Sequence, residues 1–374
     1  MNELQEIIKA YDHAKVSKQA CVLATVVHLE GSSYRRPGAR MLVLEDGTMI
    51  GAISGGCLEG DALKKAFLTF TEKKTKLVTY DTRDEEDAQV GVQLGCEGII
   101  HVLFEYIHPN ISHNPIELFR VTIADRRQAV VVTLFNLSDK KNNQPGTCVL
   151  QTSDGIFISS INKEDECKLL QQGIQDTFQK GHAQFKQYTP EDSLANAFYD
   201  LIHPPVSLVI VGAGNDAIPL MQMATLLGWE VKVVDGRQTH AKPDRFSSAC
   251  QILVSKPETV LAQMIVDLKT CFVLMTHNYQ YDLQMLKALL QTQVPYIGVL
   301  GPKKKLNKML GDFQQQGIVV TEEMLTRIYG PTGLDIGAET PQEIASSIIA
   351  EIQAAMNHKN GAMLKWKETE IHST

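Results

Sequence analysis

The chain has 374 residues, of which 44% are hydrophobic and 21% are charged, a composition typical of a globular protein of two or three domains. Its 36 basic and 43 acidic residues give a net charge of −7, which argues against general nucleic-acid binding because that function needs a basic face. Residues 1–20 lack the apolar segment of a signal peptide, and no apolar stretch has the length of a membrane span. We therefore expect a cytoplasmic protein that binds neither nucleic acid nor membranes.

The N-terminal part, residues 1–203, is predicted to be a mixed α/β domain. Its expected elements are helices at 3–18 and 58–71 and strands at 21–29, 41–44, 48–53, 76–81 and 99–107. The dipeptide Asp46-Gly47 predicts a hairpin turn between two of these strands. Residues 109–203 extend the domain with a strand at 129–135 and a helix at 164–180, and they carry no sharp motif. We expect no internal repeat.

The dipeptide Pro204-Pro205 marks the main domain boundary, and residues 204–356 are predicted to form a Rossmann-like, doubly wound parallel sheet, followed by a polar tail at 357–374. An apolar run at 208–211 predicts a buried parallel strand. The turn after it, residues 212–217, fits the pattern Gly-x-Gly-x-x-Ala of dinucleotide-binding domains.

Each residue of this glycine turn has an expected role. Gly212 permits the tight turn, and Gly214 lets a phosphate approach the backbone at the start of the next helix. Asp235 ends the following strand, where such domains place the carboxylate that binds ribose, and Arg237 is a candidate phosphate ligand instead. The bland alternative is a Rossmann fold that binds no nucleotide.

Two later strands also end in polar residues. His277 follows the strand at 271–275, with Asp282 one helical turn beyond, and Gly301 and Lys303 follow the strand at 295–300. Because ligands bind outside the carboxyl ends of parallel strands, we expect these residues to gather with the glycine turn. His277 is a candidate acid, base or ligand, and its bland alternative is a hydrogen bond to its own loop.

Residues 31–40 contain three arginines in a short loop bounded by glycines. Arg35, Arg36 and Arg40 are suited to binding a phosphate or carboxylate, and the alternative is that they are solvated surface residues. Further along, Gly55-Gly56 places Cys57 at a predicted helix N-terminus.

The position of Cys57 favours a thiolate that can bind a metal, although acidic residues in the first turn oppose this. Cys96 also lies in a tight turn, between Gly95 and Glu97. For both thiols the alternative is a small packed residue. The seven cysteines lack a Cys-x-x-Cys pair, which argues against iron–sulfur clusters and structural zinc.

These segments together resemble the XdhC/CoxI family of molybdenum-cofactor maturation factors. The matching pieces in the N-terminal part are residues 31–43, 51–60, 80–82, 95–96 and 102–105, all within residues 10–108. Those in the C-terminal part are 211–214, 275–277 with Asp282, 296–298 with Gly301, and 333–341. The sequence departs from the family pattern around Cys96, where Glu97 follows, so Cys96 is the weaker ligand candidate.

The resemblance implies an accessory protein that binds molybdenum cofactor, aids its maturation and delivers it to a xanthine-dehydrogenase-type molybdenum hydroxylase, with a cysteine desulfurase as a further partner. It implies a chaperone rather than a catalyst. The chain is too short, and lacks the cysteine clusters, to be a complete xanthine dehydrogenase. We expect a homodimer, the commonest oligomer.

On this resemblance the cofactor lies in a cleft between the two halves. We expect its phosphate, or a nucleotide extension, to lie on the turn from Gly212 to Gly214 with help from Lys303, and one of the three arginines to close over the pterin. Cys57 is the expected soft ligand of molybdenum, and His277 and Asp282 are expected to hydrogen-bond the pterin. Two alternatives remain open, an NAD(P)-dependent oxidoreductase and a nucleotide-sensing partner protein without catalysis.

Overall fold

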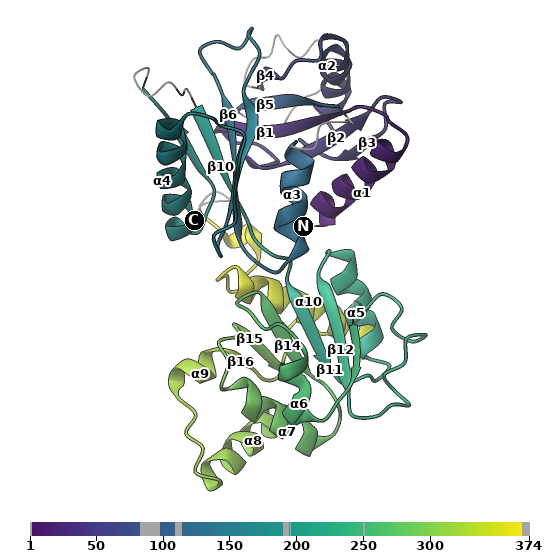
Figure 1. The fold of residues 1–374 in the computed structure, drawn as a ribbon. Helices are drawn as coiled ribbons and strands as arrows, with labels where there is room; N and C mark the ends of the chain where they lie inside the picture. The colour runs from purple at the N-terminus through teal and green to yellow at the C-terminus, as the bar shows by residue number, and fades with distance from the viewer. Residues whose placement is uncertain are drawn as a thin grey trace. The chain divides into compact units, whose positions relative to one another are not determined.

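The computed structural model describes residues 2–82, 98–108, 114–189, 194, 196–249 and 251–368. The chain divides into two compact units, Met1–Pro204 and Pro205–Thr374, each of which is described by itself (Figure 1). Among the described residues, no helix combines the length and apolar character needed to cross a membrane.

Unit 1 begins with an antiparallel five-stranded sheet. Its elements are α1 (Asn2–Val16), β1 (Cys21–Gly31), β2 (Arg40–Leu44), β3 (Met49–Gly51), α2 (Glu59–Glu72), β4 (Lys76–Asp81) and β5 (Gly98–Ile107). The strand order is β3-β2-β1-β5-β4, and the hairpin predicted around Asp46-Gly47 joins β2 to β3. The alternating side chains of β1 are buried on both faces, because α2 covers one face and α1 packs on the other.

A second antiparallel sheet follows within unit 1. Its elements are α3 (Pro115–Ala124), β6 (Ala129–Phe135), β7 (Gly146–Thr152), β8 (Phe157–Ser159), α4 (Glu164–Lys180), β9 (Gln184–Gln187) and β10 (Asn196–Ile202). The strand order is β8-β7-β6-β10-β9. Helix α3 packs beside α1 in a core shared with the first sheet, and α4 covers the opposite face (Figure 1).

The two sheets are repeats of one topology, so the expectation of no internal repeat is wrong. Each half has the element order helix, three strands, helix, two strands, and the strand orders match when the second is renumbered. The sequence keeps a trace of this: Pro37-Gly38 precedes Asp46-Gly47 by the same spacing that separates Pro145-Gly146 from Asp154-Gly155. Few other identities survive, which explains why the repeat escaped sequence inspection.

The two repeats also contact each other reciprocally through their last strands. Gly38, with φ +94°, faces the carboxylate of Asp200 on β10, and a Cβ there would lie 3.2 Å from Oδ1. Gly146, with φ +87°, faces the carboxylate of Glu105 on β5, and a Cβ would lie 2.7 Å from Oε1. The middle segment of the chain therefore closes over the arginine-bearing loop of the first repeat.

Glu105 is a buried carboxylate whose charge we expect to cost stability at neutral pH. Burial raises its pKa above the ordinary 4.5, although Thr147 donates to it from N–H (2.6 Å) and Oγ1 (2.9 Å). The folded state then binds a proton more tightly than the unfolded state does. Stability therefore falls as the pH rises from about 4.5 to the folded pKa, and it stays at the lower level above that.

Glu105→Gln keeps the shape and removes the charge. We expect the free energy of unfolding at pH 7 to rise by on the order of 1 kcal/mol, with a smaller gain at pH 4. Urea unfolding at both pH values measures this, with the exposed Glu45→Gln as the matched control. A variant less stable than the wild type at pH 7 would contradict the assignment of an unfavourable buried charge.

Unit 2 contains a six-stranded, fully parallel sheet with strand order β13-β12-β11-β14-β15-β16. The strands are β11 (Ser207–Val211), β12 (Glu230–Asp235), β13 (Gln251–Val254), β14 (Thr270–Leu274), β15 (Tyr296–Val299) and β16 (Ile328–Tyr329). This is the order of a Rossmann sheet, and it confirms the predicted fold class.

Helices cover both faces of this sheet, as Figure 1 shows. They are α5 (Ala217–Leu226), α6 (Pro257–Val260), α7 (Tyr279–Leu289), α8 (Lys303–Gln315), α9 (Glu322–Thr326) and α10 (Pro341–Met356). Leu208 and Ile210 of β11 pack with α5 and α10, while Val209 and Val211 pack with α7 and α8. The apolar run at 208–211 is explained by this burial on both faces.

Candidate functional site

In unit 1 the turn that carries Cys57 is built around the side chain of Ser54. Its Oγ accepts hydrogen bonds from the N–H groups of Gly56 and Leu58, both at 3.1 Å, and from the Cys57 thiol at 3.4 Å. The same hydroxyl donates to Glu59 Oε2 at 2.5 Å, and the Ser54 N–H donates to Oε1 at 2.8 Å. The turn is therefore fixed from within, and it leaves the thiol partly exposed.

Glu59, the first residue of α2, is the acid that holds this turn. Burial alone raises its pKa, but the hydrogen bonds from Ser54 outweigh burial and hold the pKa below its ordinary value. Glu59 therefore stays ionised at neutral pH with both oxygens engaged. Its charge stabilises the turn by binding Ser54, and Ser54 in turn accepts a hydrogen bond from the Cys57 thiol.

Other segments of the family resemblance pack around the same turn. The ring of Tyr34 lies against Gly55, where a Cβ would come within 3.3 Å of it. Gly98 packs so closely on Ser32 that a Cβ would lie 2.5 Å from the Ser32 carbonyl oxygen. The N-terminal motifs thus gather at one end of the first sheet. Cys96, the weaker predicted ligand, lies outside the described residues.

The predicted anion-binding arginines divide into two groups. Arg35 donates from Nη2 to both carboxylate oxygens of Glu3, each at 2.8 Å, and Arg40 donates from Nη2 to Asp200 at 2.6 Å. Arg36 is exposed. Arg35 and Arg40 are therefore paired with carboxylates of this chain that come from distant parts of the sequence.

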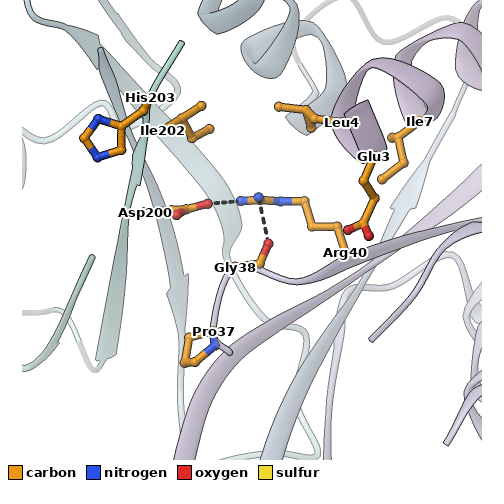
Figure 2. A pocket seen from close by; sticks show the side chains of 9 residues that line it. All are labelled: Glu3, Leu4, Ile7, Pro37, Gly38, Arg40, Asp200, Ile202 and His203. Atoms are coloured by element: carbon orange, nitrogen blue, oxygen red, sulfur yellow. Dashed lines mark hydrogen bonds and ion pairs between the residues drawn. The ribbon is translucent and has the colours of Figure 1, made fainter. Parts of the chain in front are cut away.

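Figure 2 shows a pocket of about 250 Å³ beside Arg40. The Arg40 guanidinium donates to Asp200 and, at 3.0 Å, to the Gly38 carbonyl oxygen. The Arg40 side chain is only 7% exposed. The pocket lining consists of Glu3, Leu4, Ile7, Pro37, Gly38, Arg40, Asp200, Ile202 and His203. Arg40 thus links the two repeats through a buried ion pair with Asp200.

In unit 2 a larger pocket, of about 690 Å³, lies at the carboxyl ends of β12, β13 and β14. It is lined by Asp235, Gly236, Arg237, Lys256, Pro257, Thr276, His277, Asn278, Tyr279 and Tyr281. The predicted gathering of Asp235 and His277 at this sheet edge is therefore present. Lys256 and the aromatic pair were not among the predicted residues.

The glycine turn is tightly enclosed by neighbouring protein. Gly212 has φ +128°, and a Cβ on it would lie 2.4 Å from the Met275 carbonyl oxygen, so its glycine is required by the close approach of β14. A Cβ on Gly214 would lie 2.4 Å from Oδ1 of Asp216. Arg245 donates to the Ala213 carbonyl oxygen at 2.8 Å and clamps the turn from the other side.

The carboxylate of Asp235 is fully engaged by its own chain. Oδ1 accepts from the Arg237 N–H (2.8 Å) and Nε (2.9 Å), and Oδ2 accepts from Arg237 Nη2 and the Ala213 N–H, both at 2.8 Å. Burial alone raises the pKa of Asp235, but these hydrogen bonds hold the pKa below its ordinary value. Asp235 is therefore an ionised, 2% exposed anchor between the turn and Arg237.

His277 and Asp282 have different surroundings. His277 has a left-handed backbone (φ 57°), and its Nε2 lies 2.9 Å from Oδ2 of Asp216, although its side chain is 67% exposed. Asp282 is fully buried and accepts from Thr276 Oγ1 and Lys305 Nζ, both at 2.7 Å. In the structure, Asp282 is therefore bonded to Thr276 and Lys305, and a direct contact with a ligand stays a prediction.

Comparison with known proteins covers both units. A family model described as XdhC and CoxI family matches residues 15–81, and one described as XdhC Rossmann domain matches residues 208–352. A protein from Bacillus subtilis (strain 168), named as a probable subunit of xanthine dehydrogenase, is 32% identical over 90% of this chain and 93% of its own. The chain belongs to the XdhC and CoxI family.

Two further relatives of this XdhC-family chain span nearly its whole length. The "Molybdenum cofactor insertion chaperone PaoD" of Escherichia coli (strain K12) is 22% identical over 94% of this chain and 89% of its own. A crystal structure described as that of a xanthine dehydrogenase from Bacillus halodurans superposes with a TM-score of 0.75 at 27% identity, covering 95% of this chain and 97% of that one. The resemblance drawn from the sequence motifs is confirmed.

The remaining candidates of the XdhC-family chain stand at the edge of the sheet. Gly301 has φ +126°, and a Cβ there would meet the Lys305 side chain at 3.1 Å. Lys303 is exposed at the start of α8. Among the described residues, no group of three His, Cys, Asp or Glu side chains is arranged to hold a metal ion.

The sequence analysis identified the motif residues but missed the residues that form hydrogen bonds with them. Ser54, Glu3, Asp200 and Asp216 each hold a predicted site residue in place. Only Ser54 lies close in sequence to the residue that it holds, three positions before Cys57. The others come from separate elements.

Proposed function

We propose that this chain is an accessory protein of a molybdoenzyme that binds molybdenum cofactor as cargo and passes it to a xanthine-dehydrogenase-type enzyme. Membership of the XdhC and CoxI family supports this, as do the names of the relatives from B. subtilis and E. coli. The observation that carries the proposal is the Cys57 turn, in which the family's N-terminal motif presents one partly exposed thiol.

Cys57 is the proposed soft ligand of the cargo. A cysteine binds a metal through its thiolate sulfur, and contact through a single thiol suits a cargo that must be released. Ser54 holds the thiol by a 3.4 Å hydrogen bond and thereby sets its direction. Cys96 remains a second candidate.

The pocket of unit 2 is the proposed binding site for the anionic end of the cargo. Lys256 brings a positive charge to it, the Arg237 guanidinium is paired with Asp235, and Tyr279 and Tyr281 supply aromatic surface suited to a flat pterin. This proposed position differs from the one expected from the sequence, in which the phosphate binds the glycine turn and Lys303. That Cys57 and this pocket contact one cofactor molecule stays a prediction, as do the homodimer and the cysteine desulfurase partner.

Reconstitution of a cofactor-free xanthine dehydrogenase tests the proposed delivery. The apoenzyme is incubated with molybdenum cofactor alone or with cofactor preloaded on this chain, and recovered activity is followed over time. We expect faster and more complete recovery with the chain, because the bound cofactor is protected until transfer. Equal recovery with and without the chain would count against a delivery role.

An NAD(P)-dependent oxidoreductase is the second candidate, favoured by the Rossmann strand order. Titration with NADH and assay with candidate substrates distinguish it from the carrier. The contacts that Asp216 and Asp235 make around the glycine turn argue against this alternative.

A further inference from the structure

A dinucleotide uses two features of a Rossmann domain. Its diphosphate lies on the backbone N–H groups of the glycine turn, and its ribose hydroxyls donate to the carboxylate that ends the second strand. In unit 2 these features are the turn at 212–217 and Asp235. Side chains of this chain lie against both.

The ribose position is closed because Asp235 has no acceptor left. A carboxylate offers about four lone-pair positions, and the hydrogen bonds from Arg237 and Ala213 fill them. A ribose hydroxyl would have to displace Arg237, which holds Asp235 through two side-chain nitrogens and its own N–H. The loss of two charge-assisted bonds makes that exchange unfavourable.

Asp216 places a carboxylate beside the diphosphate position. This residue directly precedes α5, where a phosphate would approach, and its carboxylate lies against Gly214. The bond from His277 Nε2 at 2.9 Å holds it there. His277 adopts a left-handed backbone to make this contact, a conformation that costs free energy in a residue with a side chain.

We propose that Asp216 and Asp235 determine the ligand specificity of unit 2 by excluding dinucleotides. Asp216 places a negative charge where the diphosphate would bind, and Asp235 gives its acceptors to Arg237. A like charge at contact distance opposes the binding of an anionic group. The pocket beside Arg237 and Lys256 then receives ligands that make no contact with the glycine turn. This proposal is independent of cofactor delivery.

Titration of the full chain with NADH, followed by NADH fluorescence, tests the exclusion. The wild type is expected to show no saturation up to ~1 mM, the upper end of ordinary enzyme affinities. Asp216→Ala and Asp216→Asn remove the charge, and each is expected to bind NADH at least about tenfold more tightly. Adding Arg237→Ala frees Asp235 and is expected to increase the gain.

Glu322→Ala, which removes an exposed acid from α9, is the matched control and should behave as the wild type. Circular dichroism identifies folded variants, and either Asp216 variant suffices if the other unfolds. Saturable NADH binding by the wild type at any concentration up to ~1 mM overturns the proposal. So does the absence of any gain in a folded Asp216 variant.

Discussion

Cys57→Ser is expected to weaken the binding of molybdenum cofactor by about tenfold or more, a change of roughly 1.4 kcal/mol. Serine preserves the size of the side chain and its hydrogen bond to Ser54, so the turn before α2 should keep its shape. It replaces the thiol by a hydroxyl, which loses its proton far less readily and so does not supply the anionic, metal-binding form that a thiol can. Anaerobic equilibrium titration of the cofactor against both proteins measures the difference.

Cys167→Ser is the matched control for this experiment. Cys167 is also a free, partly exposed thiol of unit 1, but it lies on α4 and bonds the Ile161 carbonyl oxygen at 3.4 Å. Its replacement should leave cofactor affinity unchanged. Equal affinity of the wild type and Cys57→Ser would remove Cys57 from the site.

Lys305→Met is expected to lower the free energy of unfolding by about 3–5 kcal/mol, the usual cost of leaving a buried charge without its partner. Asp282 is fully buried, and Lys305 Nζ, at 2.7 Å, is its charged partner. The same ammonium donates to the Leu300 carbonyl oxygen at 2.8 Å, so it ties α7 and α8 to the end of β15. Denaturant unfolding of the full chain measures the loss.

Two further variants show whether the loss comes from the stranded charge. Asp282→Asn in the Lys305→Met background removes that charge and should recover most of the lost stability. Lys303→Met, an exposed position on the same helix turn, should change stability by less than about 0.5 kcal/mol. If Lys305→Met costs no more than Lys303→Met, the buried pair does not support this sheet edge.

The Rossmann unit could be predicted from sequence because its signals are local. The apolar run at 208–211, the glycine turn and Asp235 lie within one strand–helix–strand unit, and each has a distinct physical reason. Even so, the tight turn alone did not fully explain why position 212 must be glycine. The approach of Met275, from a strand some sixty residues away, could not be foreseen from the turn itself.

Roles of the site residues were harder to predict than their positions. Arg35 and Arg237 look like free cations in the sequence, and the fold brings Glu3 and Asp235 onto their guanidinium groups. Asp235 was near in sequence, yet its predicted partner was a ribose. Whether a charged side chain is available to a ligand depends on such contacts, which motif spacing does not encode.

The duplication in unit 1 shows a different limit. Strand order survives in both repeats, while the sequence retains little beyond two turn dipeptides in each. Backbone turns demand glycine at positive φ, as at Gly38 and Gly146, whereas packed positions tolerate many apolar residues. The second repeat has Cys148 where the first has Arg40, so only the first repeat kept the cation.

Equilibrium binding of purified molybdenum cofactor to the full wild-type chain, under anaerobic conditions, tests the carrier role most directly. Binding is monitored by absorbance and by molybdenum content after gel filtration. We expect saturable binding with no more than one cofactor per chain, and release when a cofactor-free xanthine dehydrogenase is added. The absence of saturable binding would contradict the carrier role and leave the fold without its proposed cargo.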